Sequence, residues 1–256
     1  MNHRSFNIFF ILLILAWIWA DSHLHAGTAA YGLLLFIYVS VLYCGSYFIR
    51  LNFFLRSFNR VQTNEKIVAL SFDDGPVEGN TALVLDILKE QKAEALFFCI
   101  GKNMEADKSL TRRIFNEGHL IGNHSYSHAP FFPLFGSHKM LEELNRTSRI
   151  CQEITGVFPR LFRPPYGVTT PNLKKAVLRG SFLSIGWSVR SYDTIIRDPV
   201  KLKKRILSRL KPGAILLLHD RMEITASLLP DLISSIRSKG YEIRRLDKMT
   251  NLNPYV

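Results

Sequence analysis

The stretch IVALSFDDGP, residues 67–76, is a short apolar run that stops abruptly at two carboxylates and a turn. An apolar run of this length, bounded by turn residues, is typical of a buried strand, and Asp73 and Asp74 stand where the chain leaves it. The side chains of adjacent residues diverge, so one carboxylate could bind a metal while the other faces a bound water. Asp-Gly is also a common turn sequence, so these residues alone do not distinguish a metal site from a simple turn. Other motifs in the chain are needed to distinguish them.

Apolar runs of this kind recur after residue 66, and amphipathic segments with helical spacing lie between them. The expected strands are 67–72, 95–100, 120–123, 161–163, 182–189, 214–219 and 241–246, and the expected helices lie near 80–91, 103–117, 138–155, 170–179, 199–210 and 224–239. Regular alternation of strand and helix predicts an α/β fold with parallel strands. Seven strands are fewer than the eight of a complete barrel, so we expect a distorted or incomplete seven-stranded (β/α) barrel.

Polar motifs stand at the ends of five of these expected strands. Parallel α/β folds build their sites at the carboxyl ends of strands, so we expect the motifs to meet at one end of the barrel. In chain order they are Asp73-Asp74, His124 with His128, Arg163 to Gly167, Arg190 to Asp193, and His219-Asp220.

The two histidines after the third strand predict a metal site. His124 and His128 are four residues apart, so one helical turn could direct both imidazoles at one cation. With one of the two carboxylates they form a set of two histidines and one carboxylate with open positions, which suits catalytic Zn²⁺ or another divalent transition metal. We leave out His138, at an expected helix start, and His119, which we expect at the opposite end of the barrel.

Two further motifs offer proton and hydrogen-bond donors. Residues 163–167 read RPPYG, a stiff turn in which prolines fix φ and the glycine lets the backbone approach a ligand. A rigid backbone N–H there could stabilise an oxyanion. His219 follows a strongly apolar strand, which makes it a candidate general acid with a tunable pKa.

The combination of SFDDGP at 71–76, HSYSH at 124–128, RPPYG at 163–167 and LLLHD at 216–220 resembles the polysaccharide deacetylase family, carbohydrate esterase family 4, which includes chitin and peptidoglycan deacetylases. The resemblance covers about residues 66–247. It implies a metal-dependent hydrolase, with zinc the expected metal, that removes N-acetyl or N-acyl groups from amino sugars by cleaving a carbon–nitrogen amide bond.

The resemblance also implies a role for each motif residue. The expected catalytic base is Asp73, and Arg163 would orient it. The expected general acid is His219. The remaining positions implied by the resemblance are the metal ligands Asp74, His124 and His128, the backbone N–H of Tyr166 as oxyanion donor, and Leu218 beside the acyl methyl group.

The motif at the fifth strand departs from the family, where it usually reads Asp-x-x-Asp-Trp after a tryptophan. Here Trp187 is present and counts as a substrate-binding residue, but Arg190 and Thr194 occupy two of the motif positions. Only Asp193 remains to support the catalytic His219. The interpretation is that activity survives while substrate choice differs.

The region before residue 50 predicts a membrane anchor. Residues 6–20 are nearly all apolar, and residues 29–49 are an uncharged run that reaches about 30 Å as a helix, enough to cross a bilayer. The shorter run could instead be the core of a signal peptide, and a buried core helix is the remaining alternative. The expected organisation is a membrane region at 1–49 with two transmembrane helices, a juxtamembrane linker at 50–65 and a catalytic domain at 66–256.

The chain carries a net charge of +12. Residues 1–59 hold three arginines and one aspartate, a charge of +2, which leaves +10 for residues 60–256. Such a domain behind an anchor could rest against anionic lipid. No nucleic-acid-binding motif is recognisable, so we expect no nucleic-acid partner. The cluster KLKKR at 201–205 is interpreted as a solvated helix face, or otherwise as a lipid-facing one.

The arginines around the apolar runs predict a cytoplasmic catalytic domain. Arg4 precedes the first run, Arg50, Arg56 and Arg60 follow the second, and the connecting loop has no Lys or Arg. By the positive-inside rule both flanks lie in the cytoplasm. If the first run does not cross, the domain is extracytoplasmic instead.

The sequence leaves more than one class of substrate possible. The loop APFFPLFG at 129–136 follows His128 and is unusually apolar, so it either packs on the barrel or contacts a membrane or a lipid tail. The expected substrate is therefore an N-acetylated polysaccharide or a lipid-linked amino sugar. The alternatives are a carbohydrate O-acetyl esterase and a catalytically silent glycan-binding relative. The oligomeric state is not predicted.

Overall fold

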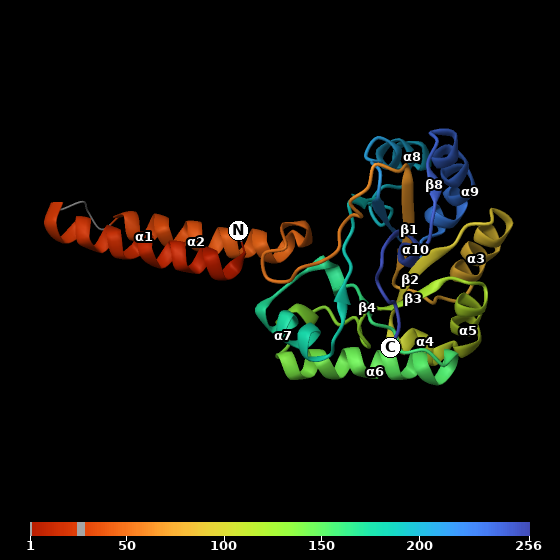
Figure 1. Ribbon diagram of the computed structural model, residues 1–256, viewed down its shortest axis with the longest axis horizontal. Coiled ribbons are helices and arrows are strands. Elements are labelled where there is room, and N and C mark those ends of the chain that lie inside the picture. Colours follow the sequence, from red (N-terminus) through yellow and green to blue (C-terminus); the bar gives the residue numbers. More distant parts are fainter. Residues whose placement is uncertain (1, 25–28) are drawn as a thin grey trace.

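The computed structural model describes residues 2–24 and 29–256, and it shows an α/β domain with two helices projecting from one side (Figure 1). Helix α1 (His3–Leu24) and helix α2 (Ala29–Tyr47) lie side by side and point away from the domain. The start of α1 and the end of α2 both lie at the domain, where the His3 N–H donates to the Phe53 carbonyl at 3.0 Å. The two helices therefore form a hairpin whose open end is fixed to the domain.

Most of the surface of this hairpin consists of exposed apolar side chains. Both helices are long and apolar enough to cross a membrane, with a mean hydropathy of 1.7 over the most apolar stretch of each. Only 11% and 6% of these stretches are buried, which contradicts the alternative of buried core helices. A signal sequence meets the same criteria of length and composition.

The end of α2 is built into the domain. Ser46 Oγ donates to the Thr169 carbonyl at 2.7 Å, and the Thr169 N–H donates back to the Ser46 carbonyl at 2.9 Å. A short 3₁₀ helix, η1 (Ile49–Leu51), follows. In it, Ile49 packs with Trp187 and Leu217 in one buried cluster. The junction between hairpin and domain is therefore a packed contact.

One sheet of eight strands, paired in parallel, forms the wall of the domain. Its order is β5 (Leu183–Ser184), β4 (Leu161–Phe162), β3 (Leu120–Asn123), β2 (Ala95–Cys99), β1 (Ile67–Asp73), β7 (Ala214–His219) and β6 (Val189–Arg190), and β8 (Glu242–Ile243) pairs with the start of β1. Strands β5 and β6 are consecutive in the chain but stand at opposite ends of this order. The sheet therefore curls into an incomplete barrel, which confirms the predicted fold.

The expected fifth strand, residues 182–189, is two short strands instead of one. Strand β5 pairs with β4 and β6 pairs with β7, so the residues between them cross the gap in the barrel. At Gly186 this crossing passes so close to Asn59 that an added Cβ would lie 2.0 Å from the Asn59 Oδ1 atom. A larger residue at this position would have to displace the Asn59 side chain.

The helices cover the outside of the sheet (Figure 1). The expected helix at 103–117 is divided at Asp107, whose side chain accepts from the Leu110 N–H at 2.9 Å and so starts a second helix. The helices are α3 (Asn80–Glu90), α4 (Gly101–Ala106), α5 (Lys108–Asn116), α6 (Ser137–Thr155), α7 (Pro171–Arg179), α8 (Pro199–Leu207), α9 (Glu223–Ser238) and α10 (Leu246–Met249), with 3₁₀ turns η2 (Phe132–Leu134) and η3 (Pro165–Gly167).

The two faces of the strands have separate cores. Leu70, Phe72 and Leu218 belong to the large cluster packed under the outer helices, whereas Ala69 and Ile215 belong to a smaller inner cluster. Successive strand residues point to opposite faces. The residues that end β1 and β7 on the inner face are Asp73 and His219, so the strands deliver both to the interior end of the barrel.

Candidate active site

The three predicted metal ligands converge. Asp74 directly follows β1, and His124 and His128 follow β3, the second strand along the sheet. The Asp74 Oδ1 atom lies 3.5 Å from the Nε2 atom of each histidine. One ligand atom from each residue lies within 4.8 Å of the others. Two imidazole nitrogens and one carboxylate oxygen fit a divalent transition metal with open positions.

The loop that brings the histidines together is not the expected helical turn. Residues 124–128 are irregular, and Ser125 and His128 have φ values of 64° and 47°. The His124 Nδ1 atom lies 2.8 Å from the Arg163 carbonyl oxygen. A carbonyl only accepts, so Nδ1 carries the proton and Nε2 keeps its lone pair on the side of Asp74. Burial, with His124 nearby, lowers the pKa of His128 to about 4, which keeps this imidazole neutral at neutral pH.

The second oxygen of Asp74 is held by a residue that the sequence analysis missed. The Arg221 Nε donates to Asp74 Oδ2 at 2.6 Å, and the Asn103 side chain donates to the Asp74 carbonyl at 2.9 Å. Burial alone would raise the pKa of Asp74, but the three surrounding imidazoles, led by that of His124, lower it overall. Asp74 is therefore an anion at neutral pH. Arg221 follows His219-Asp220 at the carboxyl end of β7, so its position was the available signal.

Asp73 is paired with a fully buried arginine. Arg163 donates through one terminal nitrogen to Asp73 Oδ1 at 2.7 Å and to Ser71 Oγ at 2.9 Å. Its remaining donors reach the carbonyls of Ile185 at 3.2 Å and Gly186 at 2.8 Å. Burial lowers the pKa of Arg163, and Asp73 opposes that change. The Asp73 Oδ2 atom stays free of this pairing and lies 3.9 Å from His124 Nε2, on the metal side.

The predicted support of His219 by Asp193 is present. The Asp193 Oδ1 atom lies 2.7 Å from His219 Nδ1, and Oδ2 accepts from the His219 backbone N–H at 2.7 Å. Ser191 and Thr225 also donate to this buried carboxylate, at 2.9 and 2.7 Å. Burial would lower the pKa of His219, but the hydrogen bond and charge of Asp193 raise it overall. Thr225 lies at the start of α9, where no sequence motif pointed to it.

These groups surround one small cavity of about 180 Å³. Trp187 lies in its wall, packed so closely on Gly167 that an added Cβ there would lie 2.3 Å from the ring. Tyr166 lines it with a φ of 62°. The lining consists of Asp73, Asp74, His124, His128, Tyr166, Gly167, Trp187, Arg190, Thr194, Leu217, His219 and Arg221.

The prediction that Leu218 lines this cavity is wrong by one residue. Leu217 lines it, whereas Leu218 is buried in the outer core cluster. The reason is the alternation of side chains along β7, because Leu217 shares a face with His219 and Leu218 does not. Counting back two residues from His219 would have identified Leu217.

The two excluded histidines lie elsewhere. His119 Nδ1 accepts from the N–H of Ala95, the first residue of β2, so it lies at the opposite end of the strands as expected. Burial lowers the pKa of His119 to about 4. His138 is exposed at the start of α6 and faces Glu142 at 3.3 Å.

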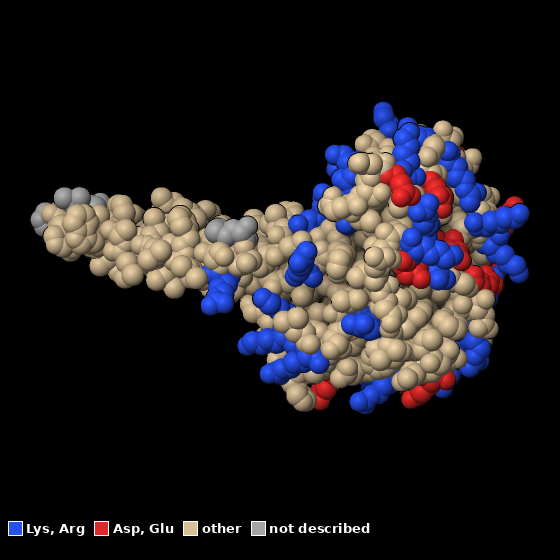
Figure 2. Space-filling model, in the orientation of Figure 1, with Lys and Arg blue, Asp and Glu red and all other residues tan. Residues whose placement is uncertain are grey.

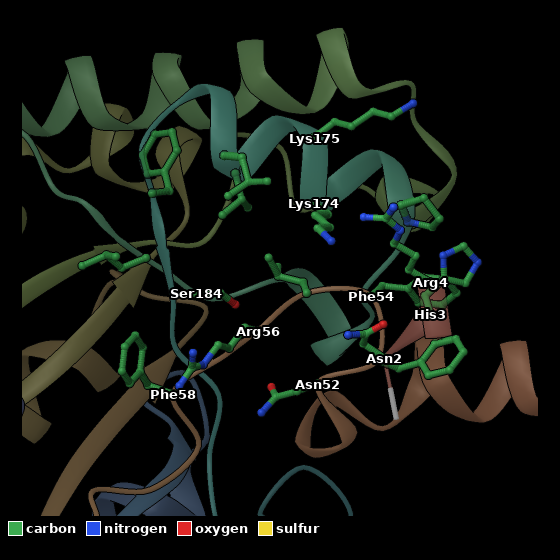
Figure 3. Close-up of a pocket in the computed structure, with 17 residues that line it drawn as sticks. Asn2, His3, Arg4, Asn52, Phe54, Arg56, Phe58, Lys174, Lys175 and Ser184 are labelled. Atoms are coloured by element: carbon green, nitrogen blue, oxygen red, sulfur yellow. The ribbon is translucent and has the colours of Figure 1, made fainter. Parts of the chain in front are cut away.

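A larger cavity is separate from these motifs. It has a volume of about 800 Å³ and lies between the start of α1, residues 52–58 and α7 (Figure 3). Arg4, Arg56, Lys174 and Lys175 line it, and no carboxylate side chain does. It therefore lacks the acid, base and ligands that the smaller cavity brings together.

Residues 60–197 match the family model described as polysaccharide deacetylase. The chain belongs to this family. It is 33% identical over 190 residues to a peptidoglycan-N-acetylglucosamine deacetylase of Listeria monocytogenes, a match that covers 74% of this chain and 40% of that relative's length. The chain thus spans less than half of that relative.

Solved structures show the same fold. A peptidoglycan N-acetylglucosamine deacetylase superposes with a TM-score of 0.73 at 30% identity, covering 77% of this chain and 94% of the other. A CE4 family pseudoenzyme from Bacillus anthracis superposes with a TM-score of 0.71 at 26% identity, covering 76% and 68%. Since a pseudoenzyme shares the fold, activity has to be argued from the site residues.

Proposed function

We propose that this chain is a metal-dependent hydrolase that removes N-acetyl groups from amino sugars in a polysaccharide or a lipid-linked glycan. One observation carries the proposal. A carboxylate held by Arg163, a ligand set on Asp74, and an imidazole held by Asp193 surround a single cavity. The names of the relatives, which act on N-acetylated peptidoglycan sugars, support a glycan substrate.

Amide hydrolysis needs a metal site, a general base and a general acid, and different residues provide each. Asp74, His124 and His128 would hold the metal, for which Zn²⁺ fits the ligand set, and the ion supplies Lewis-acid polarisation of water and the acyl carbonyl. Asp73 accepts the proton of the attacking water through its free oxygen, while Arg163 fixes the other. Opposite it, the His219 imidazolium protonates the departing amine.

Two further groups fit the acyl end of the substrate. The backbone N–H of Tyr166, on the turn η3, is proposed to stabilise the developing oxyanion. Leu217, on the same face of β7 as His219, is proposed to contact the acyl methyl group. Trp187 stands beside Leu217 and closes the wall against solvent.

Replacing Asp193 with asparagine is expected to move the alkaline limb of the pH–kcat profile to lower pH. The general acid works while His219 is protonated, so the rate falls as pH rises through the pKa of His219, and Asp193 raises that pKa. Removing the negative charge lowers it again. Ser191→Ala, which keeps the charge and removes one donor to Asp193, is the control. An unchanged profile in Asp193→Asn would refute the proposed support.

The proposed function is tested on the full chain purified in detergent. We expect equimolar release of acetate and free amine from N-acetylated oligosaccharides, loss of both after chelation, and recovery on adding Zn²⁺. Hydrolysis of acetate esters alone would identify a carbohydrate O-acetyl esterase. Glycan binding without bound metal or turnover would identify a silent relative, the reading that Arg190 and the pseudoenzyme of the same fold suggest.

We further propose that α1 and α2 span the membrane and hold the domain on its cytoplasmic face. Both ends of the hairpin meet the domain, and Lys and Arg gather at that junction while the projecting part is almost free of charge (Figure 2). Arg4, Arg50 and Arg56 therefore lie on one side, as the positive-inside rule favours. Protection of the domain from protease in intact cells is expected; digestion without permeabilisation would place it outside.

A further inference from the structure

A second cavity adjoins the catalytic one, at the junction between α2 and the domain. Its volume is about 180 Å³, and it shares Trp187 and Arg190 with the catalytic cavity. The other side chains come from the end of α2 and η1, from the residues on either side of β6, and from α8 and the segment after it. The lining consists of Tyr47, Phe48, Ile49, Arg50, Trp187, Ser188, Arg190, Tyr192, Arg205 and Arg209.

This cavity concentrates positive charge without a counterion. Arg50, Arg190, Arg205 and Arg209 line it, no carboxylate does, and within the described residues none of the four forms an ion pair. Some other arginines of the chain are paired, as Arg244 is with Glu65 and Glu242. Like charges gathered in this way are stabilised by an anion between them.

The geometry around Arg205 gives an independent sign of a missing partner. Its guanidinium lies 4.2 Å from the centre of the Tyr192 ring, and that of Arg190 lies 4.9 Å from the same ring. The Nε atom of Arg205 is buried and has no hydrogen-bond acceptor among the described residues. Burial, together with Arg209 and Arg190, lowers the pKa of Arg205. A buried donor without an acceptor is costly, so an acceptor from a ligand would remove that cost.

Arg205 also corrects an expectation from the sequence. Lys201 and Lys204 on α8 are exposed, as expected for a solvated face, but Lys203 pairs with Asp231 at 2.6 Å and Arg205 turns into the cavity. The KLKKR cluster is therefore divided between solvent and this site.

We propose that the arginine cavity binds the phosphate of a phosphorylated amino sugar while the acetamido group of the same sugar enters the catalytic cavity. The proposal rests on the proposed function. In a 2-acetamido sugar 1-phosphate, the phosphate is attached to the carbon next to the one that bears the amide. Two cavities that share Trp187 and Arg190 match that short separation. Guanidinium groups bind phosphate oxygens through paired N–H donors.

The position of the cavity favours a lipid-linked sugar phosphate over a soluble one. Tyr47 is the last residue of α2, and Phe48 and Arg50 follow it, so a phosphate bound there lies where the hairpin enters the domain. If the hairpin spans the bilayer, this is the level of the lipid headgroups. Arg190, which replaces the usual residue of the family motif, then has a role because it supplies a cation to both cavities.

The test compares three substrates on the zinc-loaded full chain in phosphatidylcholine vesicles: polyprenyl diphosphate-linked N-acetylglucosamine, N-acetylglucosamine 1-phosphate, and a neutral chitooligosaccharide. The double variant Arg205→Gln with Arg209→Gln is expected to lower the ratio of kcat/KM for phosphorylated to neutral substrate about tenfold or more. Most of the change is expected in KM. Arg209 is exposed, so the single variant Arg209→Gln is expected to fold normally. It tests the same effect if the double variant misfolds.

The charge-matched control is Lys174→Gln with Lys175→Gln. It removes the same charge from the other basic cavity at the hairpin junction (Figure 3) and is expected to leave the substrate ratio unchanged. The phosphate site is supported if the double variant Arg205→Gln with Arg209→Gln lowers kcat/KM for both phosphorylated substrates relative to the neutral one. A larger decrease in kcat/KM for the polyprenyl substrate than for N-acetylglucosamine 1-phosphate supports a lipid-linked substrate.

Two results would overturn the inference. An equal loss on neutral and phosphorylated substrates would show that the arginines only stabilise the structure. The assay is repeated in vesicles that also contain phosphatidylglycerol, and a loss that appears only with this anionic lipid, whatever the substrate, would assign the cavity to membrane headgroups. If the wild type hydrolyses none of the substrates, calorimetric titration with N-acetylglucosamine 1-phosphate still tests the phosphate site. Equal affinity in the wild type and the arginine variants would refute the site.

Discussion

Replacing Asp73 with asparagine is expected to lower kcat for deacetylation by about 10³-fold while the bound metal stays in place. Asparagine has the same shape, and its amide oxygen can still accept from Arg163, which lies 2.7 Å from the Asp73 Oδ1 atom. An amide, however, cannot take the proton of the attacking water. Acetate release measured beside zinc content per chain separates lost chemistry from lost metal.

Asp74→Asn is the matched comparison, one residue away. Asp74 places one oxygen 3.5 Å from both histidines, so its loss is expected to lower zinc content, and excess Zn²⁺ should restore part of the activity. Zinc should not restore Asp73→Asn. If Asp73→Asn keeps wild-type kcat, or loses its metal as Asp74→Asn does, the assignment of Asp73 as the base is wrong.

Replacing Arg163 with methionine is expected to lower the free energy of unfolding by about 3–5 kcal/mol, because it breaks a buried ion pair from one side. Methionine fills much of the space but donates nothing. Asp73 is then a buried carboxylate without a counterion, and the carbonyls of Ile185 and Gly186 lose their partners at the crossing between β5 and β6. Urea titration of the full chain in mild detergent, followed by circular dichroism, measures the change.

Two variants test the physical reason for that loss. Arg163→Lys keeps the charge but cannot reach four acceptors at once, so an intermediate loss is expected. Adding Asp73→Asn to Arg163→Met removes the isolated charge and is expected to recover part of the stability, in a double-mutant cycle. A strictly additive cycle would mean that the pairing of Arg163 with Asp73 contributes nothing to stability.

The barrel and most of its site could be predicted because the relevant signals are local. Apolar runs that end in Asp73-Asp74 or His219 mark the strand ends, and parallel strands bring their ends together without knowledge of any contact. The convergence of Asp74, His124 and His128 therefore followed from the sequence. The irregular path between His124 and His128 did not, because left-handed φ values at Ser125 and His128 leave no clear pattern in residues of these types.

Most of the features that escaped prediction depend on tertiary packing. Leu217 is the exception: strand β7 is apolar on both faces, so hydropathy did not distinguish Leu217 from Leu218, but the alternation of side chains from His219 does. Arg221 and Thr225 act through partners that lie far away in the sequence, Asp74 and Asp193. Arg205 belonged to a basic cluster that looked uniformly solvated, and only the position of Tyr192 shows why it turns inward.

The contact of Ile49 with Trp187 and Leu217 means that the segment directly after α2 supports two residues in the wall of the catalytic cavity. A shortened protein that begins after η1 would leave Trp187 and Leu217 open to water on the side that Ile49 now covers, and it would lose the two hydrogen bonds between Ser46 and Thr169. Catalytic constants from such a fragment would describe a differently shaped pocket. The hairpin and η1 therefore contribute to the structure of the domain as well as connecting to it. Biochemical measurements should use the whole chain.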